Sequence, residues 1–137
     1  MYDVILEDGP LDGLLGFSHG TTFAMMWLLQ HAVKNPMDAL WSIVGCVVFI
    51  AGPSPFGEDG ERLRNPDAGV KLRIPTVHIV GKGDELYEDA LKMYSLCEEG
   101  GRVLVEHEKG HVIPRDEETV RRMTKTIKDL RGKMVSI

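Results

Sequence analysis

Residues 11–34, LDGLLGFSHGTTFAMMWLLQHAVK, hold an apolar segment, a turn rich in small residues and a run of helix formers in direct succession. The apolar segment 11–17 predicts a short buried strand. The run 21–34 predicts a helix that is mostly buried, because apolar residues cover nearly all of its faces. Asn35 and Pro36 predict its end, since the residue before a proline avoids helical geometry. This stretch therefore predicts a strand, a sharp turn and a helix, in that order.

The chain beyond this unit alternates between strand and helix patterns. Continuous β-branched or apolar runs, typical of strands covered on both faces, occur at 43–50, 74–80 and 102–107. Apolar residues at helical spacing occur at 2–8, 86–98 and 117–131. Strands that alternate with helices pair in parallel. We therefore expect an α/β fold with a mostly parallel sheet of about four strands and flanking helices.

The composition is that of one globular domain. With 43% hydrophobic residues, the 137-residue chain can bury one core, so we expect a single domain over 1–137. Sixteen basic against 21 acidic residues give a net charge of −5, which argues against nucleic-acid and polybasic membrane partners. The longest apolar stretch, 43–52, is too short to span a bilayer, and the N-terminus shows no secretory signal. Cys46 and Cys97 are too few and too far apart for a disulfide framework, which favours a cytoplasmic setting with both thiols buried.

Three polar residues follow strands at what would be one edge of the sheet. Ser18 follows the first strand within Gly16-Phe-Ser-His-Gly20, Asp84 follows the third strand, and His111 follows the fourth. Ligand sites in parallel sheets lie beyond these carboxyl ends, and serine, acid, histidine is the chain order of the α/β-hydrolase triad. Each residue alone also fits a helix cap, a turn or a surface loop. Together they predict a catalytic group.

The predicted chemistry is acyl transfer. His111 would take the proton of Ser18 as its oxygen attacks an acyl carbon, and Asp84 would hold the imidazole in the required tautomer. The backbone N–H of His19 would point at the oxyanion. Water activated by His111 would then release the acid. The substrate class is therefore a small-molecule acyl ester or thioester.

Three segments of the chain resemble FSH-type serine hydrolases. They are the nucleophile segment 9–20, the acid segment 74–84 and the histidine segment 105–114. These hydrolases are small α/β-hydrolases of fungi and animals, related to the ovarian-cancer-associated gene 2 product. The resemblance covers the chain from about residue 2 onward. It implies esterase or thioesterase activity on small to medium acyl substrates, with no metal and no organic cofactor; fungal relatives include thioesterases that release polyketides from synthases.

The chain departs from the family pattern at two places. His19 stands where the family usually has glutamine, which should matter little because only the backbone N–H is needed. Fewer than a dozen residues precede the first strand, so we expect the C-terminal part of an α/β-hydrolase fold, that is, a single truncated domain. The second oxyanion donor of that fold comes from an earlier loop, and losing one donor costs about 10²–10³ in rate. The Ser18 strand would then be an open sheet edge, which makes a homodimer possible.

Two alternative interpretations remain open from the sequence. Residues 107–111 match the zinc-binding pattern HExxH, but that use requires a helix, and here a strand precedes the pattern while Gly110 and Pro114 oppose helix formation. The other alternative is a non-catalytic remnant of the hydrolase fold that acts as an interaction or dimerisation module.

The remaining features are expected to be structural, with one exception. His31, His78 and His107 fall on a helix or on strands, where a packing role is the ordinary one. Asp116 is expected to cap the last helix. The long loop 52–73 follows a strand at the active edge, so we expect it to cover the substrate.

Overall fold

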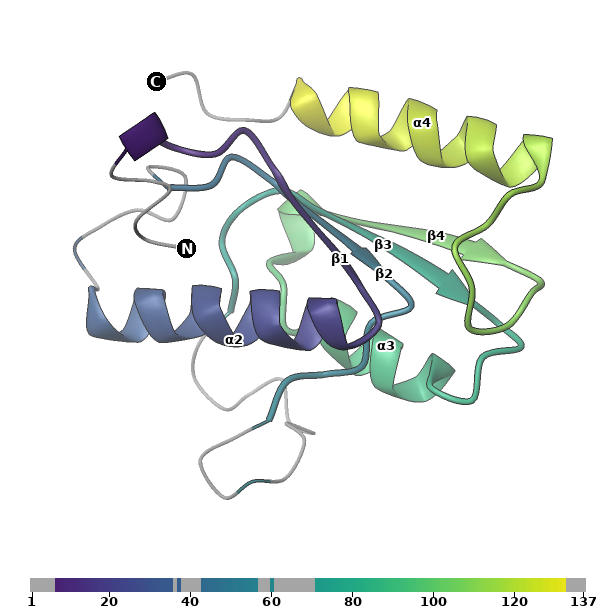
Figure 1. The fold of residues 1–137 in the computed structure, drawn as a ribbon, viewed down its shortest axis with the longest axis horizontal. Helices are drawn as coiled ribbons and strands as arrows, with labels where there is room; N and C mark the ends of the chain where they lie inside the picture. Colours follow the sequence, from purple (N-terminus) through teal and green to yellow (C-terminus); the bar gives the residue numbers. More distant parts are fainter. Residues whose placement is uncertain (1–6, 36, 38–42, 57–59, 61–70, 133–137) are drawn as a thin grey trace.

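A computed structural model describes residues 7–35, 37, 43–56, 60 and 71–132. Four parallel strands form one sheet in chain order: β1 (Leu14–Phe17), β2 (Val47–Ile50), β3 (Thr76–Gly81) and β4 (Arg102–His107). The register pairs Phe17 with Ile50, Ile50 with Ile79 and Gly81 with His107. All four carboxyl ends therefore lie at the same edge of the sheet, on the right in Figure 1.

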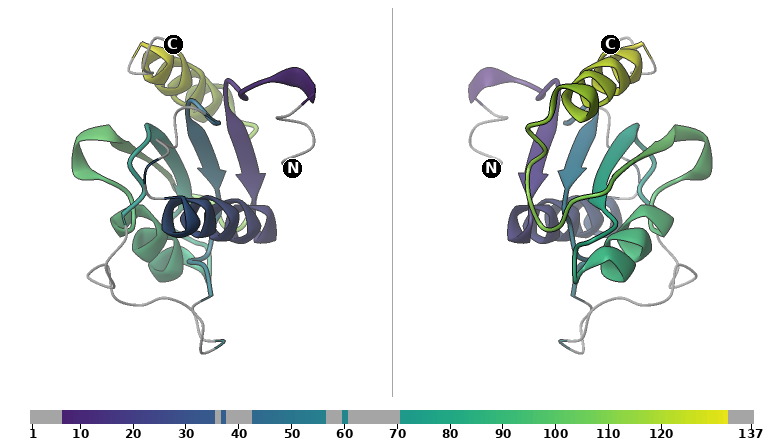
Figure 2. Two further views of the ribbon diagram at one scale, coloured as in Figure 1. Left: turned by 90° about the vertical axis from the view of Figure 1, so that its left-hand side faces the viewer. Right: turned by 90° about the vertical axis from the view of Figure 1, so that its right-hand side faces the viewer.

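Helices cover both faces of this sheet. The helices α2 (His19–Lys34) and α3 (Tyr87–Ser95) lie on one face, and α4 (Glu117–Arg131) lies on the other (Figure 2). A short 3-10 helix, η2 (Glu99–Gly101), leads into β4. This arrangement confirms the predicted α/β fold with a parallel sheet of four strands.

The core has two apolar layers, one on each face of the sheet. The layer under α2 and α3 contains Met25, Leu28, Phe49, Leu72 and Met93, all fully buried. The layer under α4 is smaller and contains Val48, Ile50, Val77, Ile79, Val105 and Leu130. Every residue of β2 and β3 is buried, which explains why β2 is a continuous apolar run and why the polar Thr76 and His78 of β3 bond each other.

The edge strand β1 is less buried than the sequence predicts. Leu15 is 60% exposed and Phe17 is 38% exposed, while Gly16 between them is buried. The reason is the position of α4, which contacts β3 and β4 and leaves the outer face of β1 uncovered. The prediction of a buried strand was therefore wrong on one face. The prediction of an open edge agrees with the order of the described strands.

Helix α2 is half-buried, and the prediction of a mostly buried helix was wrong. Its buried face carries Thr21, Thr22, Ala24, Met25, Leu28 and His31. On its outer face Phe23, Met26 and Val33 are exposed, because the structure places the sheet on one side of the helix only. The helix begins at His19, two residues before the predicted start, and Asn35 caps its end as predicted.

The other elements follow the predictions closely. Strand β4 and helix α4 have the predicted bounds, and Asp116 accepts a hydrogen bond from the Thr119 N–H at 3.0 Å as the N-cap of α4. Strand β2 is shorter than predicted, because Val44 forms only an isolated bridge with Leu11. The predicted helix 86–98 ends at Ser95.

Some sequence predictions fall on residues that lie outside the described ones. Of the predicted helix 2–8, only Glu7 and Asp8 are described, and both are helical. Most of the loop 52–73 is likewise outside.

The two cysteines differ in burial. Cys97 is buried as predicted, but Cys46 is half-buried, so that expectation was wrong; both are free thiols. Among the described helices, none has the length and apolar character needed to cross a bilayer.

Candidate active site

Ser18 occupies a strained turn between β1 and α2. Its backbone has φ 54° and ψ −120°, in the left-handed range of φ that residues with a side chain rarely adopt. The Ser18 N–H donates to the Ile50 carbonyl at 2.9 Å, and its own carbonyl accepts the N–H and the hydroxyl of Thr21 at 3.0 and 2.6 Å. A Cβ at Gly16 would lie 2.8 Å from the Thr21 nitrogen, so only glycine permits this close approach of strand and helix.

The side chains of Ser18, His111 and Asp84 form one continuous chain of hydrogen bonds. The distance from Ser18 Oγ to His111 Nε2 is 2.7 Å, and the distance from His111 Nδ1 to Asp84 Oδ2 is also 2.7 Å. The structure thus brings together the three residues that were predicted from separate segments. An ionised carboxylate can only accept, so Nδ1 carries the proton and Nε2 is free to accept the serine hydroxyl.

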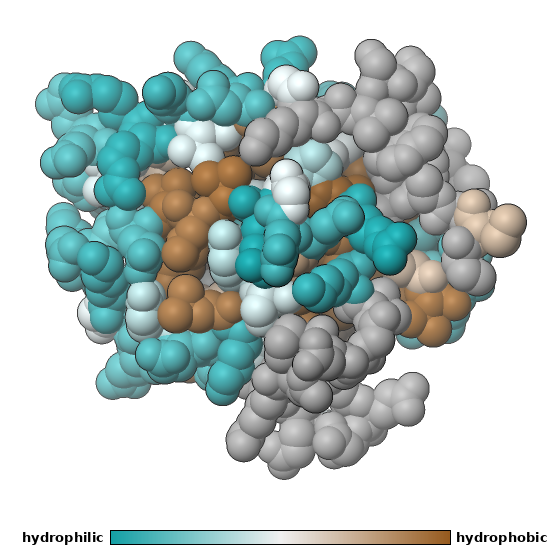
Figure 3. Space-filling view, turned by 180° about the vertical axis from the view of Figure 1, so that it is seen from behind, coloured by the Kyte–Doolittle hydropathy of each residue, from teal (hydrophilic) through white to brown (hydrophobic). Residues whose placement is uncertain are grey.

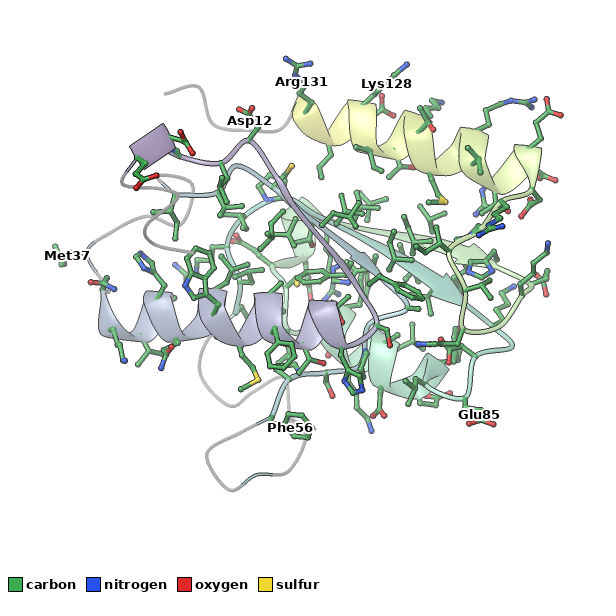
Figure 4. The ribbon with its side chains drawn as sticks, viewed as in Figure 1. Asp12, Met37, Phe56, Glu85, Lys128 and Arg131 are labelled. Carbon is green, nitrogen blue, oxygen red and sulfur yellow. The ribbon has the colours of Figure 1, made fainter. Side chains whose placement is uncertain are left out.

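Asp84 is oriented by its own turn. Its side chain is 2% exposed, and its Oδ1 accepts the Leu86 N–H at 2.8 Å while Oδ2 contacts His111. The neighbouring acid, Glu85, is exposed and points away from the molecule (Figure 4). Of two adjacent carboxylates, therefore, only the first reaches the imidazole.

The loops that carry Asp84 and His111 are bound to each other by main-chain hydrogen bonds. The Lys82 N–H donates to the His107 carbonyl at 2.8 Å, and the Gly83 N–H donates to the Lys109 carbonyl at 3.0 Å. A Cβ at Gly81 would overlap the carbonyl oxygens of Lys109 and Gly110. This contact fixes the histidine loop against the acid loop.

The surroundings of His111 combine an apolar ring with a helix N-terminus. The Phe17 ring lies 5.6 Å from the imidazole, centre to centre, and Val112 and Ile113 beside it are exposed. His19 is the first residue of α2, and the first N–H groups of a helix have no partner within it. Its backbone N–H, next to Ser18, is therefore suited to bind a negatively charged oxygen.

Residues 107–111 do not form the helix that an HExxH zinc site needs. His107 is the last residue of β4, and the chain then turns through 108–111. The His107 Nδ1 accepts the Lys109 N–H at 3.1 Å. Among the residues that the structure describes, no three His, Cys, Asp or Glu side chains are grouped so that they could hold a metal ion. His31 and His78 are buried in the core.

Sequence reasoning did not identify Thr21 as part of the site. This buried residue closes the Ser18 turn with two hydrogen bonds, as described above. A threonine three residues after the serine is a recognisable pattern, because Ser and Thr hydroxyls often bind a carbonyl one helical turn before them.

Comparison with known proteins shows the family to which this chain belongs. The family model described as "Serine hydrolase (FSH1)" matches residues 1–123. The chain is 37% identical over 124 residues to hydrolase phiM of Talaromyces stipitatus, covering 85% of this chain and 48% of that protein. It is 33% identical over 138 residues to esterase FPY3 of Fusarium mangiferae, covering 98% of this chain and 63% of that protein. The chain thus spans roughly half to two thirds of the length of these relatives.

A solved structure supports the fold independently. The crystal structure of the esterase domain of a Rhodothermus marinus protein superposes with a TM-score of 0.63 at 14% identity, covering 98% of this chain and 66% of that one. The fold is thus that of the α/β-hydrolases, and the matching family consists of serine hydrolases. The chain belongs to the FSH1 family of serine hydrolases.

Proposed function

We propose that this chain hydrolyses carboxylic esters or thioesters through an acyl-enzyme formed on Ser18. The observation that carries the proposal is the unbroken relay from Ser18 Oγ through His111 to Asp84, with both distances at 2.7 Å. Nucleophile, base and orienting carboxylate are all within hydrogen-bond reach, which is the geometry that activates a serine at neutral pH.

The reaction proceeds in two halves. Ser18 Oγ attacks the acyl carbon while its proton passes to His111 Nε2, and the imidazolium then protonates the departing alkoxide or thiolate. A water molecule next gives a proton to Nε2 and attacks the acyl-enzyme, which releases the acid and returns the proton to Ser18. Asp84 stabilises the imidazolium in both halves. None of these steps requires a metal or an organic cofactor.

The strained turn at Ser18 acts as a nucleophile elbow in this proposal. In this proposal the turn presents the hydroxyl beyond the strand ends, and the His19 N–H would face the negatively charged oxygen that forms on the acyl carbon. That N–H supplies one oxyanion donor. A hydrolase that lacks a second donor is slower by about 10²–10³, so an assay should test dependence on Ser18 first and absolute rate second.

The substrate is a small to medium acyl ester or thioester. Phe17 contacts the His111 ring, and Phe17, Val112 and Ile113 are exposed, so the surface near His111 has an apolar character that suits an acyl chain. The predicted role of loop 52–73 as a substrate cover falls mostly on residues outside the described ones. Free thiols at Cys46 and Cys97 suit a reducing compartment such as the cytoplasm.

Labelling with a fluorophosphonate probe tests the proposal. The wild-type chain and the Ser18→Ala variant are labelled in parallel, with turnover of p-nitrophenyl acetate and butyrate measured on the same samples. Ser95→Ala is the matched control, because the Ser95 hydroxyl donates to the Lys92 carbonyl at the end of α3 and belongs to no proposed catalytic step. We expect labelling and turnover that disappear with Ser18→Ala and persist with Ser95→Ala. A folded wild-type chain that takes no label would overturn the proposal.

One observation favours an interaction role as a second candidate. The two edges of the described sheet differ: at β1 Leu15 is exposed, whereas at β4 Arg102 stacks over Tyr94 at 4.2 Å and Tyr87 bonds Glu106 at 2.5 Å. Seen from the β4 side, polar residues border the exposed apolar surface and divide it into separate parts (Figure 3). We propose that β1 is the edge that pairs with a second copy of the chain. Light scattering should then show a dimer that Leu15→Lys converts to a monomer.

A further inference from the structure

His107 is a buried, titratable residue that the proposed mechanism does not use. It ends β4 and is 4% exposed, although Glu108 and Lys109 directly after it are exposed. Its Nδ1 accepts the backbone N–H of Lys109 at 3.1 Å. An imidazole whose Nδ1 accepts a hydrogen bond is the neutral form, with its one ring proton on Nε2.

The neutral form of this ring agrees with its surroundings. Burial lowers the pKa of His107 below its ordinary value, with Lys109 and Arg122 acting in the same direction and Asp116 and Asp84 against it. The Nε2 atom is buried, and the described residues provide no hydrogen-bond partner for it. The bond to Lys109 is therefore the polar contact that the described structure gives this ring.

The Lys109 peptide connects His107 to the acid loop. The Lys109 N–H donates to His107 Nδ1, and the Lys109 carbonyl accepts the Gly83 N–H at 3.0 Å. Gly83 directly precedes Asp84, and Lys109 lies two residues before His111. Lys109 is thus held at both its N–H and its carbonyl, and it joins the segments that carry Asp84 and His111, whose side chains lie 2.7 Å apart.

We propose that His107 is a positioning residue: its Nδ1 orients the Lys109 peptide and thereby sets His111 against Asp84. The inference rests on the proposed hydrolase function, because it assigns His111 the role of base. Without the acceptor, the Lys109 N–H loses its buried partner and the loop shifts to find another. Misplacement of a reacting group by about 1 Å costs on the order of 10²-fold in rate.

A pair of variants with the same side-chain shape tests this role. His107→Asn keeps an acceptor at the position of Nδ1, whereas His107→Leu places a methyl group there. We expect the leucine variant to lose about ten- to a hundredfold in kcat with KM unchanged, since the proposed role of His107 is to position His111 and not to bind substrate. We expect the asparagine variant to keep most of the wild-type kcat. Equal kcat in the two variants would overturn the proposal.

Two further measurements separate positioning from a general loss of stability. His78→Asn removes another buried histidine of the sheet and should lower Tm without lowering kcat. Nitrogen NMR of the His111 imidazole should show the bond to Asp84 in the asparagine variant and its loss in the leucine variant. If the leucine variant does not fold, His107→Gln replaces it, because its amide lies one methylene beyond the Nδ1 position.

The NMR measurement also distinguishes the two proposals. A wild-type chain without Ser18-dependent turnover would refute the proposed function, while the His111 resonances would still report on His107. An unchanged His111–Asp84 bond in the leucine variant would refute the positioning role even if the chain is an active hydrolase.

Discussion

His78 should make the fold sensitive to mild acid. The residue lies in the middle of β3, 1% exposed, with its ring centre 5.1 Å from those of Phe49 and Tyr94. Burial lowers the pKa of His78 to about 3, and the positive charge of Arg102 acts in the same direction. The folded protein therefore keeps this ring neutral at pH values where the unfolded chain protonates it.

The sign and size of the effect follow from this difference. Below pH 6.5 the unfolded state binds a proton at His78, whereas the folded state does not until about pH 3, so stability falls as the pH falls through this window. Each unit of pH costs about 1.4 kcal/mol in the free energy of unfolding. Between pH 7.5 and pH 4.5 the loss due to His78 is about 3 kcal/mol.

Urea unfolding at these two pH values measures the loss. His78→Gln is the comparison, because its amide does not titrate and can still bond the Thr76 hydroxyl, which lies 2.9 Å from His78 Nε2. Between the two pH values, the free energy of unfolding of the variant should fall by about 3 kcal/mol less than that of the wild type. His107, whose pKa is also lowered, contributes equally to both proteins, and Asp116 titrates below this window. An identical pH dependence in both proteins would refute the reasoning.

Three further predictions concern the candidate active site. Asp84→Asn should lower kcat by up to about 10⁴-fold through the wrong imidazole tautomer, while the exposed neighbour Glu85→Gln should leave kcat unchanged; equal effects would contradict the assignment. Thr21→Val removes the hydroxyl that binds the Ser18 carbonyl and should cost roughly 1 kcal/mol in the activation barrier, whereas Thr21→Ser should retain the rate; the kcat values of the pair decide this. Gly81→Ala forces a methyl group against the Lys109 and Gly110 carbonyls, so the free energy of unfolding should fall by about 1–3 kcal/mol. Thermal unfolding measures this loss, and an unchanged Tm would contradict the contact.

The elements that the sequence predicted best are those whose environment is uniform. Strand β2 is buried throughout, so its apolar run indicates a strand, although the strand is shorter than the run. Helix α4 has one apolar face, a capping aspartate and charged outer residues, and its bounds were predicted correctly. In each case the local pattern and the tertiary environment agree.

Predictions failed where burial depends on what lies opposite an element. Leu15 and Phe23 are apolar, but their exposure depends on the position of α4 and on the one-sided contact of α2 with the sheet. A single sequence does not contain that information. The exposure of Cys46, 46 residues into the chain and just before β2, depends on tertiary packing in the same way.

The catalytic residues of the candidate site could be predicted from the sequence, but the residues that hold them in position were not predicted. Ser18, Asp84 and His111 follow from strand order and residue type, because parallel strands bring their carboxyl ends together. The contributions of Thr21 and His107 depend on hydrogen bonds to backbone groups; the three-residue spacing could have indicated the first, but no pattern in the sequence indicates the second. The structure was needed to show that the His107 Nδ1 accepts the Lys109 N–H.

The two hydrogen bonds between the acid loop and the histidine loop join Asp84 and His111 into one rigid unit. Ser18 belongs to a second unit, since its turn is hydrogen-bonded to β2 and to the first turn of α2. A displacement of the serine turn relative to the two loops would therefore change the distance from Ser18 to His111 and leave the distance from His111 to Asp84 unchanged.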